Sequence, residues 1–269
     1  MFAASPDRAT IFALLERAEP GDLEAATALL QAALESDLHT EGPDHHNVAR
    51  DRNNLGLALR AQGQFQAAAE MIASALKSDL SKYGPDHPSV ARDRASLAQV
   101  QQDQGELASA VELLRLALES NLRSYGTDHP IVASNRDALG LTLLARGDVQ
   151  GAVESFQAAF ALRSDAAAPH LVRCRTSLGV ALRAQGNYHG AIEQFQAALQ
   201  VDLRADHPSA VRCRRELYVR QRASLFSRFP SSPVFSVPAA LGGPAPKPPL
   251  TPRLFFLDLF LLSMHAHGR

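Results

Sequence analysis

The sequence predicts an all-α fold built as an array of helical hairpins, because one unit of about 42 residues recurs along most of the chain. Three regular features support this prediction: evenly spaced glycines, apolar residues at helical spacing, and a loop sequence repeated between units. A hairpin of this kind cannot bury its apolar face alone, so neighbouring units must stack to form a shared core. At 269 residues the chain is long enough for such an array without division into compact domains.

Evenly spaced glycines mark a turn within each unit. They are 42 residues apart at first and 39 apart at the end, and each is followed two residues later by an apolar side chain. We therefore expect five equivalent turns, at Gly21, Gly63, Gly105, Gly147 and Gly186.

Apolar and small residues follow a helical spacing on both sides of each turn. After the turn, alanines recur three and ten residues beyond the apolar position, as at Ala68 and Ala75. Before the turn, a leucine and a small residue stand together, as Leu55–Gly56, Leu97–Ala98, Leu139–Gly140 and Leu178–Gly179. These spacings predict two amphipathic helices per unit, and the small residues allow the helices to approach closely.

A third feature is the loop between units. It reads E-G-P-D-H-H at 41–46, Y-G-P-D-H-P at 83–88 and Y-G-T-D-H-P at 125–130, with weaker copies at 166–170 and 205–208. Glycine can end one helix in a left-handed conformation, aspartate can cap the next helix, and proline suits its first turn. We expect each period to consist of a helix, a tight turn, a longer helix and a loop.

These features resemble the tetratricopeptide repeats, and specifically the 42-residue repeats of kinesin light chain and its bacterial look-alikes. The third full unit matches the repeat pattern at Leu139, Gly140, Gly147, Val149, Ala152, Phe156 and Ala159, and the fourth at Leu178, Gly179, Gly186, Tyr188, Ala191, Phe195 and Ala198. The junction residues typical of the light-chain type are Asp86, His87, Pro88, Val90 and Ala91. The asparagine pair of that type occurs once, as Asn53 and Asn54. The resemblance covers residues 20 to about 220 and implies a right-handed α-solenoid whose first helices line a concave groove.

The resemblance divides the chain into a solenoid, residues 1–225, and a tail, residues 226–269. We expect repeats at about 8–41, 46–83, 88–125, 130–166 and 169–205, followed by a capping helix at 207–225. Half of the 16 prolines lie between residues 229 and 253, which forbids a continuing helix and predicts a disordered linker.

An apolar segment, residues 254–264, follows the proline-rich linker. As a helix it would be about 16 Å long, half the thickness of a bilayer core, and Asp258 interrupts it. We therefore do not expect a transmembrane span. Three interpretations stay open: docking on the solenoid in cis, anchoring to a partner or a membrane surface, or no function.

Composition and motifs argue against several classes of function. The net charge of −1 disfavours a general nucleic-acid binder, which needs a basic face. Phosphate-binding loops, serine elbows and metalloprotease motifs are absent from the sequence, so we expect neither catalysis nor a cofactor. No secretory signal is visible, and a cytoplasmic location is expected.

Repeated histidines and cysteines invite a test for metal binding or a disulfide. The histidines recur once per unit, so neighbours lie about 10 Å apart and cannot share a metal ion. We expect His45, His87, His129 and His207 to cap helices and pack loops. Cys174 and Cys213 occupy equivalent positions in successive units, too far apart for a disulfide, and are expected to be packing residues.

The candidate site is the inner face that the resemblance implies, at positions two and five residues on either side of each helix leucine. These positions hold Arg50, Asn53, Leu57 and Arg60; Arg92, Ala95, Gln99 and Gln102; Ser134, Asp137, Leu141 and Leu144; and Arg173, Thr176, Val180 and Arg183, with Asn54 beside them. Arginine pairs with carboxylates, and Asn and Gln can hold an extended peptide backbone. We expect an acidic or C-terminal-carboxylate peptide with an apolar side chain; the alternative is a merely solvated face.

A second arginine series stands three residues before each helix leucine. We expect its stems to pack along the neighbouring unit while the guanidinium groups reach acids such as Asp37, Asp79 or Asp202, a structural role favoured over ligand binding. The series consists of Arg52, Arg94, Arg136, Arg175 and Arg214.

Together these features predict a non-catalytic scaffold or adaptor that binds other proteins or peptides. A regulatory subunit of an enzyme or signalling system and a kinesin-light-chain-like cargo adaptor are alternatives. A membrane role is not expected, and self-docking of the tail segment 254–264 remains a hypothesis.

Overall fold

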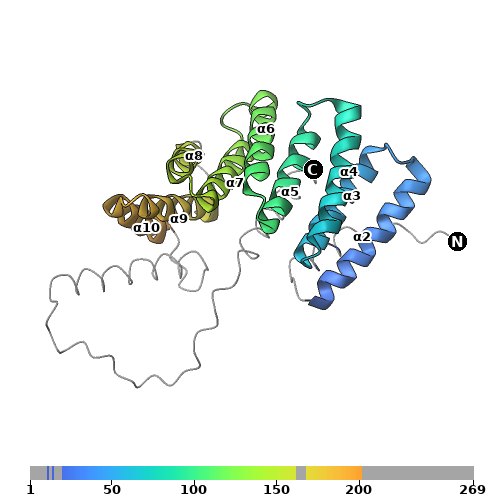
Figure 1. Ribbon diagram of the computed structural model, residues 1–269, viewed down its shortest axis with the longest axis horizontal. Coiled ribbons are helices and arrows are strands. Elements are labelled where there is room, and N and C mark those ends of the chain that lie inside the picture. Colours follow the sequence, from blue (N-terminus) through green and yellow to red (C-terminus); the bar gives the residue numbers. More distant parts are fainter. Residues whose placement is uncertain (1–10, 12–13, 15–19, 162–167, 202–269) are drawn as a thin grey trace, which may run out of the picture.

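The computed structural model describes residues 11, 14, 20–161 and 168–201 of the chain, and every regular element in these ranges is an α-helix (Figure 1). The helices are α2 (Pro20–Glu41), α3 (His46–Ala61), α4 (Phe65–Tyr83), α5 (Pro88–Gln104), α6 (Leu107–Tyr125), α7 (Pro130–Arg146), α8 (Val149–Ala161), α9 (Ala168–Ala184) and α10 (Tyr188–Val201). The predicted all-α class is confirmed for the part of the chain that the structure describes.

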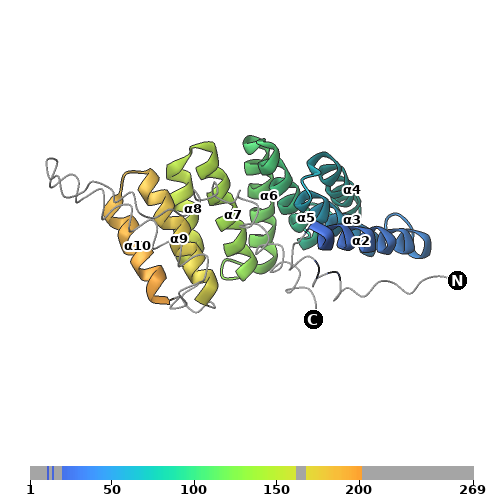
Figure 2. The same ribbon diagram turned by 90° about the horizontal axis from the view of Figure 1, so that it is seen from below.

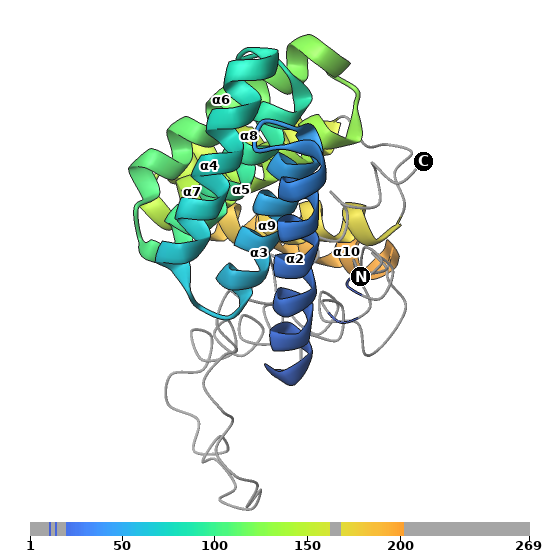
Figure 3. The same ribbon diagram turned by 90° about the vertical axis from the view of Figure 1, so that its right-hand side faces the viewer.

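The helices pair into four hairpins, α3–α4, α5–α6, α7–α8 and α9–α10, which follow one another in a row (Figure 2). We call the first helix of each hairpin the A helix and the second the B helix. Each B helix packs on the next A helix, so contacts join neighbours in the sequence, and α2 packs on α3 in the same way. Figure 3 shows the later helices stacked behind α2. The predicted hairpin array is therefore confirmed.

The A helices form the tighter layer of this array. α3 also contacts α5, and α7 contacts α9, whereas successive B helices touch each other less. A row of hairpins whose A helices are closer together than its B helices curves toward the A-helix side. The face formed by α3, α5, α7 and α9 is consequently the inner one.

Four of the five predicted glycine turns are present. Gly63, Gly105, Gly147 and Gly186 each have a φ between 82° and 91°, a left-handed conformation that side chains with a Cβ rarely adopt. Gly21 differs, because it lies inside the first turn of α2 and has no positive φ. The reason is local: α2 begins at the preceding proline, whose fixed φ suits a first helical turn.

Histidine, and not the predicted aspartate, caps the A helices. The imidazole Nδ1 atoms of His45, His87 and His129 accept hydrogen bonds from the backbone N–H two residues later, at 3.4, 3.2 and 3.2 Å. The prediction that these histidines cap helices is confirmed, and the prediction of an aspartate cap is wrong. Each aspartate stands one residue too early in the chain to occupy the cap position.

The rest of the junction follows the expected pattern. Pro88 and Pro130 lie in the first turn of their helices. Gly84 and Gly126 end the preceding helices with φ of 81° and 76°, although their ψ values near 180° are extended. Aromatic stacking adds to the caps, since the rings of Tyr83 and His87 have centroids 4.3 Å apart.

Small residues hold the two helices of a hairpin together as predicted. A methyl group added at Gly56 would lie 2.5 Å from Cγ1 of Ile72, and one at Gly140 would lie 2.7 Å from the ring of Phe156. These distances are shorter than any van der Waals contact, so only glycine fits between the helices there.

The buried apolar side chains form two clusters. One runs from Ile11 and α2 to Val100 of α5, and the other runs from Ala98 of α5 to α10. Helix α5 contributes to both clusters, and it is also where the largest buried polar network of the structure lies.

Several predictions fall outside the described residues. These are the capping helix 207–225, the tail 226–269 with its segment 254–264, and the residues Asp202, His207, Cys213 and Arg214. The right-handed twist remains a prediction. Among the described helices, none combines the length and apolar character needed to cross a membrane.

Candidate functional site

The inner surface of the A helices presents a row of partly exposed side chains, which we call the A-helix face. Residues three, four or seven apart lie on one side of a helix, and the members on α3, α7 and α9 follow this spacing. The members are Arg50, Asn54 and Leu57 on α3, Arg92 and Gln102 on α5, Leu141 and Leu144 on α7, and Val180 and the exposed Arg183 on α9. These nine predicted site residues are therefore at least partly exposed on the A helices.

Other predicted site residues are buried between neighbouring A helices. Asn53, Asp137 and Thr176 are only 1–2% exposed. Asn53 Nδ2 donates to Asp93 Oδ1 at 2.9 Å, and Thr176 Oγ1 donates to the carbonyl of Val172 at 2.7 Å. This placement differs from the inward-facing position expected from the sequence, because the A helices approach closely enough to cover it.

Three of the predicted inner-face residues form hydrogen bonds between neighbouring A helices. Arg60 Nε donates to Asp103 Oδ2 at 2.6 Å, and its Nη1 donates to Gln99 Oε1 at 3.0 Å. Both Arg60 and Gln99 are buried. At the next junction between A helices, Gln102 Nε2 of α5 donates to Thr142 Oγ1 of α7. These hydrogen bonds join neighbouring repeats, so they stabilise the array.

The same holds for Arg173 on α9. Its guanidinium is buried and lies 3.3 Å from Asp137 Oδ2 on α7. Cys174 Sγ lies at 3.3 Å from the same carboxylate oxygen. Two of the other predicted members have smaller roles: Ala95 packs against the core, and Ser134 Oγ donates to the carbonyl of Pro130.

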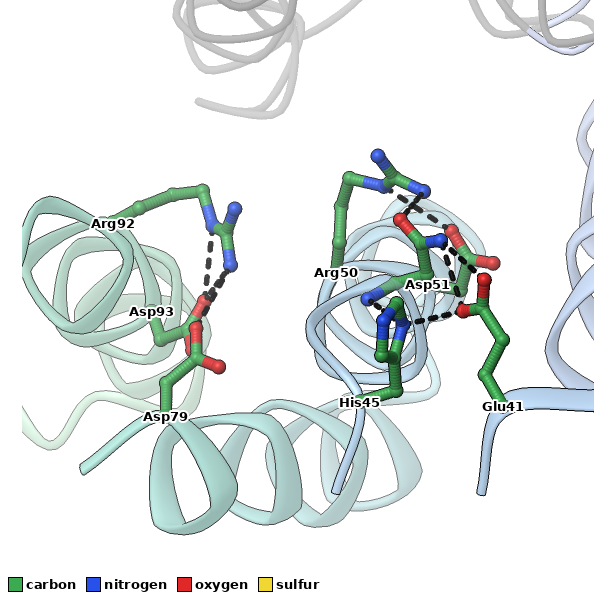
Figure 4. A network of polar contacts seen from close by, with 8 residues as sticks. Glu41, His45, Arg50, Asp51, Asp79, Arg92 and Asp93 are labelled. Atoms are coloured by element: carbon green, nitrogen blue, oxygen red, sulfur yellow. Dashed lines mark hydrogen bonds and ion pairs between the residues drawn. The ribbon is translucent and has the colours of Figure 1, made fainter. Parts of the chain in front are cut away.

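The most strongly perturbed group of the face is a cluster at the junction of α3, α4 and α5 (Figure 4). Arg92 donates from Nε and Nη2 to Asp93 Oδ1 at 3.0 and 2.9 Å, and from Nη2 to Asp79 Oδ2 at 3.4 Å. Two carboxyl groups therefore share one guanidinium. Asp93 is fully buried, whereas the Arg92 side chain is 20% exposed.

Burial shifts the acidity of both carboxyl groups. It raises the pKa of Asp93 to about 7, with a further contribution from the charge of Asp79, while Arg92 opposes the shift. Burial also raises the pKa of Asp79, again against the effect of Arg92. The cluster thus contains one carboxyl group, that of Asp93, whose pKa lies near neutral pH, which is unusual for aspartate.

A second polar cluster lies beside the first, at the start of α3 (Figure 4). Arg50 Nη2 donates to Asn47 Oδ1 at 2.7 Å, and Asn47 Nδ2 donates to both oxygens of Glu41 at 2.9 and 3.0 Å. His45 Nδ1 lies 2.5 Å from Glu41 Oε2. Burial lowers the pKa of the neighbouring His46, and the charge of His45 adds to this effect.

Sequence reasoning identified the arginines of the face but missed the carboxylate partners Asp93 and Asp103, and it assigned Asp79 to the second arginine series instead of to Arg92. A signal was present, because Asp51 and Asp93 stand 42 residues apart at the same place in their repeats. Both are buried. A charged residue that recurs at a buried position of a repeat indicates contacts between repeats.

The next junction along the array carries a neutral version of the cluster. Asn121, Ser134 and Asn135 stand 42 residues after Asp79, Arg92 and Asp93, respectively. Asn121 and Asn135 are buried like the aspartates that they replace. The cluster is thus charged at the α4–α5 junction and neutral at the α6–α7 junction, while the α2–α3 junction has the same charged residue types, Asp37, Arg50 and Asp51, at the equivalent positions.

The second arginine series is structural in its contacts, but its partners differ from the prediction. Arg52 and Arg94 donate to the carbonyls of Pro43 and Pro85 at 3.1 and 2.9 Å, and Arg136 donates to the carbonyl of Ala158 at 3.2 Å. Asp79 instead binds Arg92. Arg52 and Arg94 thus contact the backbone of the preceding loop, at the proline nine residues before each arginine.

The fourth member of the series, Arg175, is also engaged. Its guanidinium carbon lies 4.7 Å from the centre of the Phe160 ring, a cation–π contact. Burial lowers the pKa of Arg94.

Among the described residues, no group of three or more His, Cys, Asp or Glu side chains is arranged to hold a metal ion.

Comparison with solved structures supports the fold. The chain is similar to the crystal structure of BtubC (BKLC) from P. vanneervenii, with 23% sequence identity and a TM-score of 0.62, over 74% of this chain and 84% of that one. It is also similar to the nearly identical TPR-like repeats of a kinesin light chain candidate from Podosopora anserina, with 23% identity and a TM-score of 0.61, over 72% of this chain and 93% of that one. No curated protein sequence matches the chain.

Family models place the chain more firmly. One tetratricopeptide repeat model matches residues 12–81 and 95–165, and a second matches residues 53–127 and 138–210. Each model covers more than half of the sequence, in register with the hairpins described above. The chain therefore belongs to the tetratricopeptide repeat family.

Proposed function

We propose that the protein is a non-catalytic scaffold whose A-helix face holds a peptide segment of a partner protein. Tetratricopeptide repeats generally mediate protein–protein interactions. In this proposal the array is a right-handed solenoid, and the partner lies along its inner side. A cargo adaptor and a regulatory subunit are two versions of this role, and both use the same face.

One observation supports the kind of partner proposed: the two ends of the A-helix face differ in chemistry. The α3 and α5 end presents the partly exposed guanidinium groups of Arg50 and Arg92. The α7 and α9 end presents Leu141, Leu144 and Val180, which pack partly against the core. A segment that fits both ends carries carboxylates, from acidic side chains or a C-terminus, and at least one apolar side chain.

The polar middle of the face suits a peptide in an extended conformation. Gln102 lies between the two ends; Thr142 accepts one N–H of its amide and the amide oxygen is buried, so the second N–H is the group left to donate to a peptide carbonyl. We expect an affinity of about 1 μM, or about 8 kcal/mol, because an extended ligand loses conformational freedom when it binds.

A peptide selection tests this function. A library of random decapeptides would be selected on the full-length chain, and the affinity of the enriched peptides would be measured by fluorescence anisotropy. We expect enriched sequences that combine Asp or Glu with an apolar residue. The double variant Leu141→Gln, Leu144→Gln should lower their affinity about tenfold or more, since it removes the apolar contact.

The matched control is Leu116→Gln. Leu116 lies on the B helix α6, is 45% exposed, and is not part of the A-helix face. This variant should bind the selected peptides as tightly as the wild type. Selection of peptides without acidic residues, or equal loss of affinity in both variants, would show that the A-helix face is not the binding site.

A further inference from the structure

We propose that the Asp79–Arg92–Asp93 cluster makes the A-helix face bind acidic segments more tightly as the pH falls through neutrality, because a proton taken up by its carboxyl pair frees Arg92 for a ligand carboxylate. This inference rests on the proposed function, since it concerns how the same face binds the same class of peptide. It assigns Arg92 the role of a pH-dependent anchor.

Two carboxyl groups, those of Asp79 and Asp93, contact the single guanidinium of Arg92. Asp93 Oδ1 accepts three N–H bonds, two from Arg92 and one from Asn53 Nδ2, whereas Asp93 Oδ2 has no hydrogen-bond partner. Arg92 Nη2 lies 2.9 Å from Asp93 Oδ1 and 3.4 Å from Asp79 Oδ2, so the two carboxyl groups flank the same nitrogen atom. Two such groups in one buried site favour a shared proton, because both cannot ionise cheaply.

The net charge of the cluster depends on how many of its two carboxyl groups are ionised. With both carboxyl groups ionised, the cluster carries a net charge of −1, and a ligand carboxylate approaching Arg92 meets repulsion. With one shared proton, the net charge is zero and the guanidinium is held by one carboxylate. The pKa of about 7 for Asp93 places this exchange within the neutral range.

Few other charged groups face the cluster. His46 on α3 and His87 at the start of α5 both act on Asp79 and lower its pKa, but by less than Arg92 does. On α6, Arg123 is bound to Asp86 at 2.6 Å. The variant Asp93→Asn separates the proton of the carboxyl pair from those of the two histidines, because it leaves both histidines in place.

Arg92 is placed to reach a ligand. Figure 4 shows the guanidinium groups of Arg92 and Arg50 on the same side of adjacent helices, above the carboxyl groups that they contact. The Arg92 side chain is partly exposed, while Asp93 beneath it is fully buried. A ligand carboxylate can thus approach the arginine but not the aspartate.

The neighbouring junction shows that folding does not require this charge. Asn121, Ser134 and Asn135 occupy the equivalent positions at the α6–α7 junction, and the hairpins there pack in the same way. The variant Asp93→Asn therefore copies a residue that the array already uses at the equivalent site. It fixes the cluster in the charge state that the proton would give it.

The test measures the affinity of the full-length chain for one probe at pH 6 and pH 8. The probe is a fluorescein-labelled decapeptide of alternating Glu and Leu with a free C-terminus, whose carboxylates stay ionised at both pH values. We expect the wild type to bind it about tenfold more tightly at pH 6 than at pH 8. Asp93→Asn should bind tightly at both, and Asp79→Asn, which removes the other carboxyl group, should do the same.

The matched control is Asp103→Asn. It removes a carboxylate of the same face, the partner of Arg60, but leaves the carboxyl pair intact. This variant should keep the wild-type ratio between pH 6 and pH 8. An equal affinity of the wild type at both pH values, or an unchanged ratio in Asp93→Asn, would overturn the inference and leave the proposed function standing. Absence of binding in every variant would instead overturn both.

Discussion

At the scale of single residues, buried charge decides which arginines can serve a ligand. Arg60 is committed to Asp103, and Arg173 to Asp137. Removing one partner of such a buried pair costs about 3–5 kcal/mol, because the other charge is left unpaired. Substitutions at Arg60 or Arg173 would therefore report on stability rather than on binding.

The raised pKa of Asp93 also predicts how stability depends on pH. Between pH 4 and about 7, the folded protein keeps a proton that the unfolded chain has already lost. The free energy of unfolding should consequently decrease as the pH rises through this range, by about 1 kcal/mol between pH 6 and pH 8. In Asp93→Asn this decrease should be absent. Urea denaturation followed by circular dichroism at pH 6, 7 and 8 measures it.

Asp103→Asn serves again as the control. Its free energy of unfolding should be lower than that of the wild type by the same amount at all three pH values, because it keeps the carboxyl pair. A wild-type protein that is more stable at pH 8 than at pH 6 would contradict the assignment of the proton to this cluster.

The contacts of single side chains are also what the sequence predicted least well. The helical spacing placed Arg50, Leu57, Arg92 and Leu141 on one face, as the structure does. It could not show that Asn53 is covered, because that depends on how closely successive A helices approach. Contacts between residues about 40 apart, such as Asn53 with Asp93, come from the stacking of repeats and not from any local pattern.

At the scale of helices, each hairpin is fixed by a small residue facing a large one. Glycine faces isoleucine in one hairpin and phenylalanine in two, and the hairpin with alanine has a leucine at the equivalent position. The pairs are Gly56 with Ile72, Ala98 with Leu114, Gly140 with Phe156, and Gly179 with Phe195. The position on the A helix is therefore always small, whichever large side chain stands at the equivalent position of the B helix.

This pairing predicts the effect of a single methyl group. In Gly56→Ala the new Cβ would lie 2.5 Å from Ile72 Cγ1 and 3.0 Å from the carbonyl oxygen of Ala68, so the helices must move apart. We expect a net loss of about 1–3 kcal/mol in the free energy of unfolding, despite the better helix propensity of alanine. Chemical denaturation of the purified variant measures this loss.

Gly21→Ala is the matched control, because Gly21 is also helical and a Cβ there would meet nothing within 4 Å. It should be neutral or stabilise the protein by up to about 1 kcal/mol. If both variants lost the same stability, the close approach of α3 and α4 at Gly56 would be refuted.

The helices themselves could be predicted because the period fixes both ends of each. Glycine and proline restrict the backbone locally, so the turns at Gly63 and Gly105 and the start at Pro88 follow from the sequence. The histidine caps were predicted, but the aspartate before each histidine was also expected to cap, because aspartate is the commoner cap residue. The choice of histidine over Asp86 depends on the exact position of the first helical residue and on the stacking of Tyr83.

At the scale of the whole molecule, the array is held by contacts between neighbours. Within the described residues, the extensive contacts between hairpins join adjacent ones, and the apolar core falls into two clusters that meet at α5. The polar bonds of Asn53 and Arg60 cross the boundary between α3 and α5. The stability of such an array is a sum of repeat and interface contributions, so damage at one end need not spread to the other.

This organisation predicts local responses to a large core cavity. Ile72→Ala, in the first cluster, should cost about 2–5 kcal/mol and accelerate amide hydrogen exchange mainly in α2, α3 and α4. Phe156→Ala, in the second cluster, should accelerate exchange mainly in α7, α8 and α9. Hydrogen exchange followed by mass spectrometry distinguishes the two patterns. Equal acceleration in all helices of both variants would show that the array unfolds as one cooperative unit, and that the polar layer at α5 does not separate its two cores.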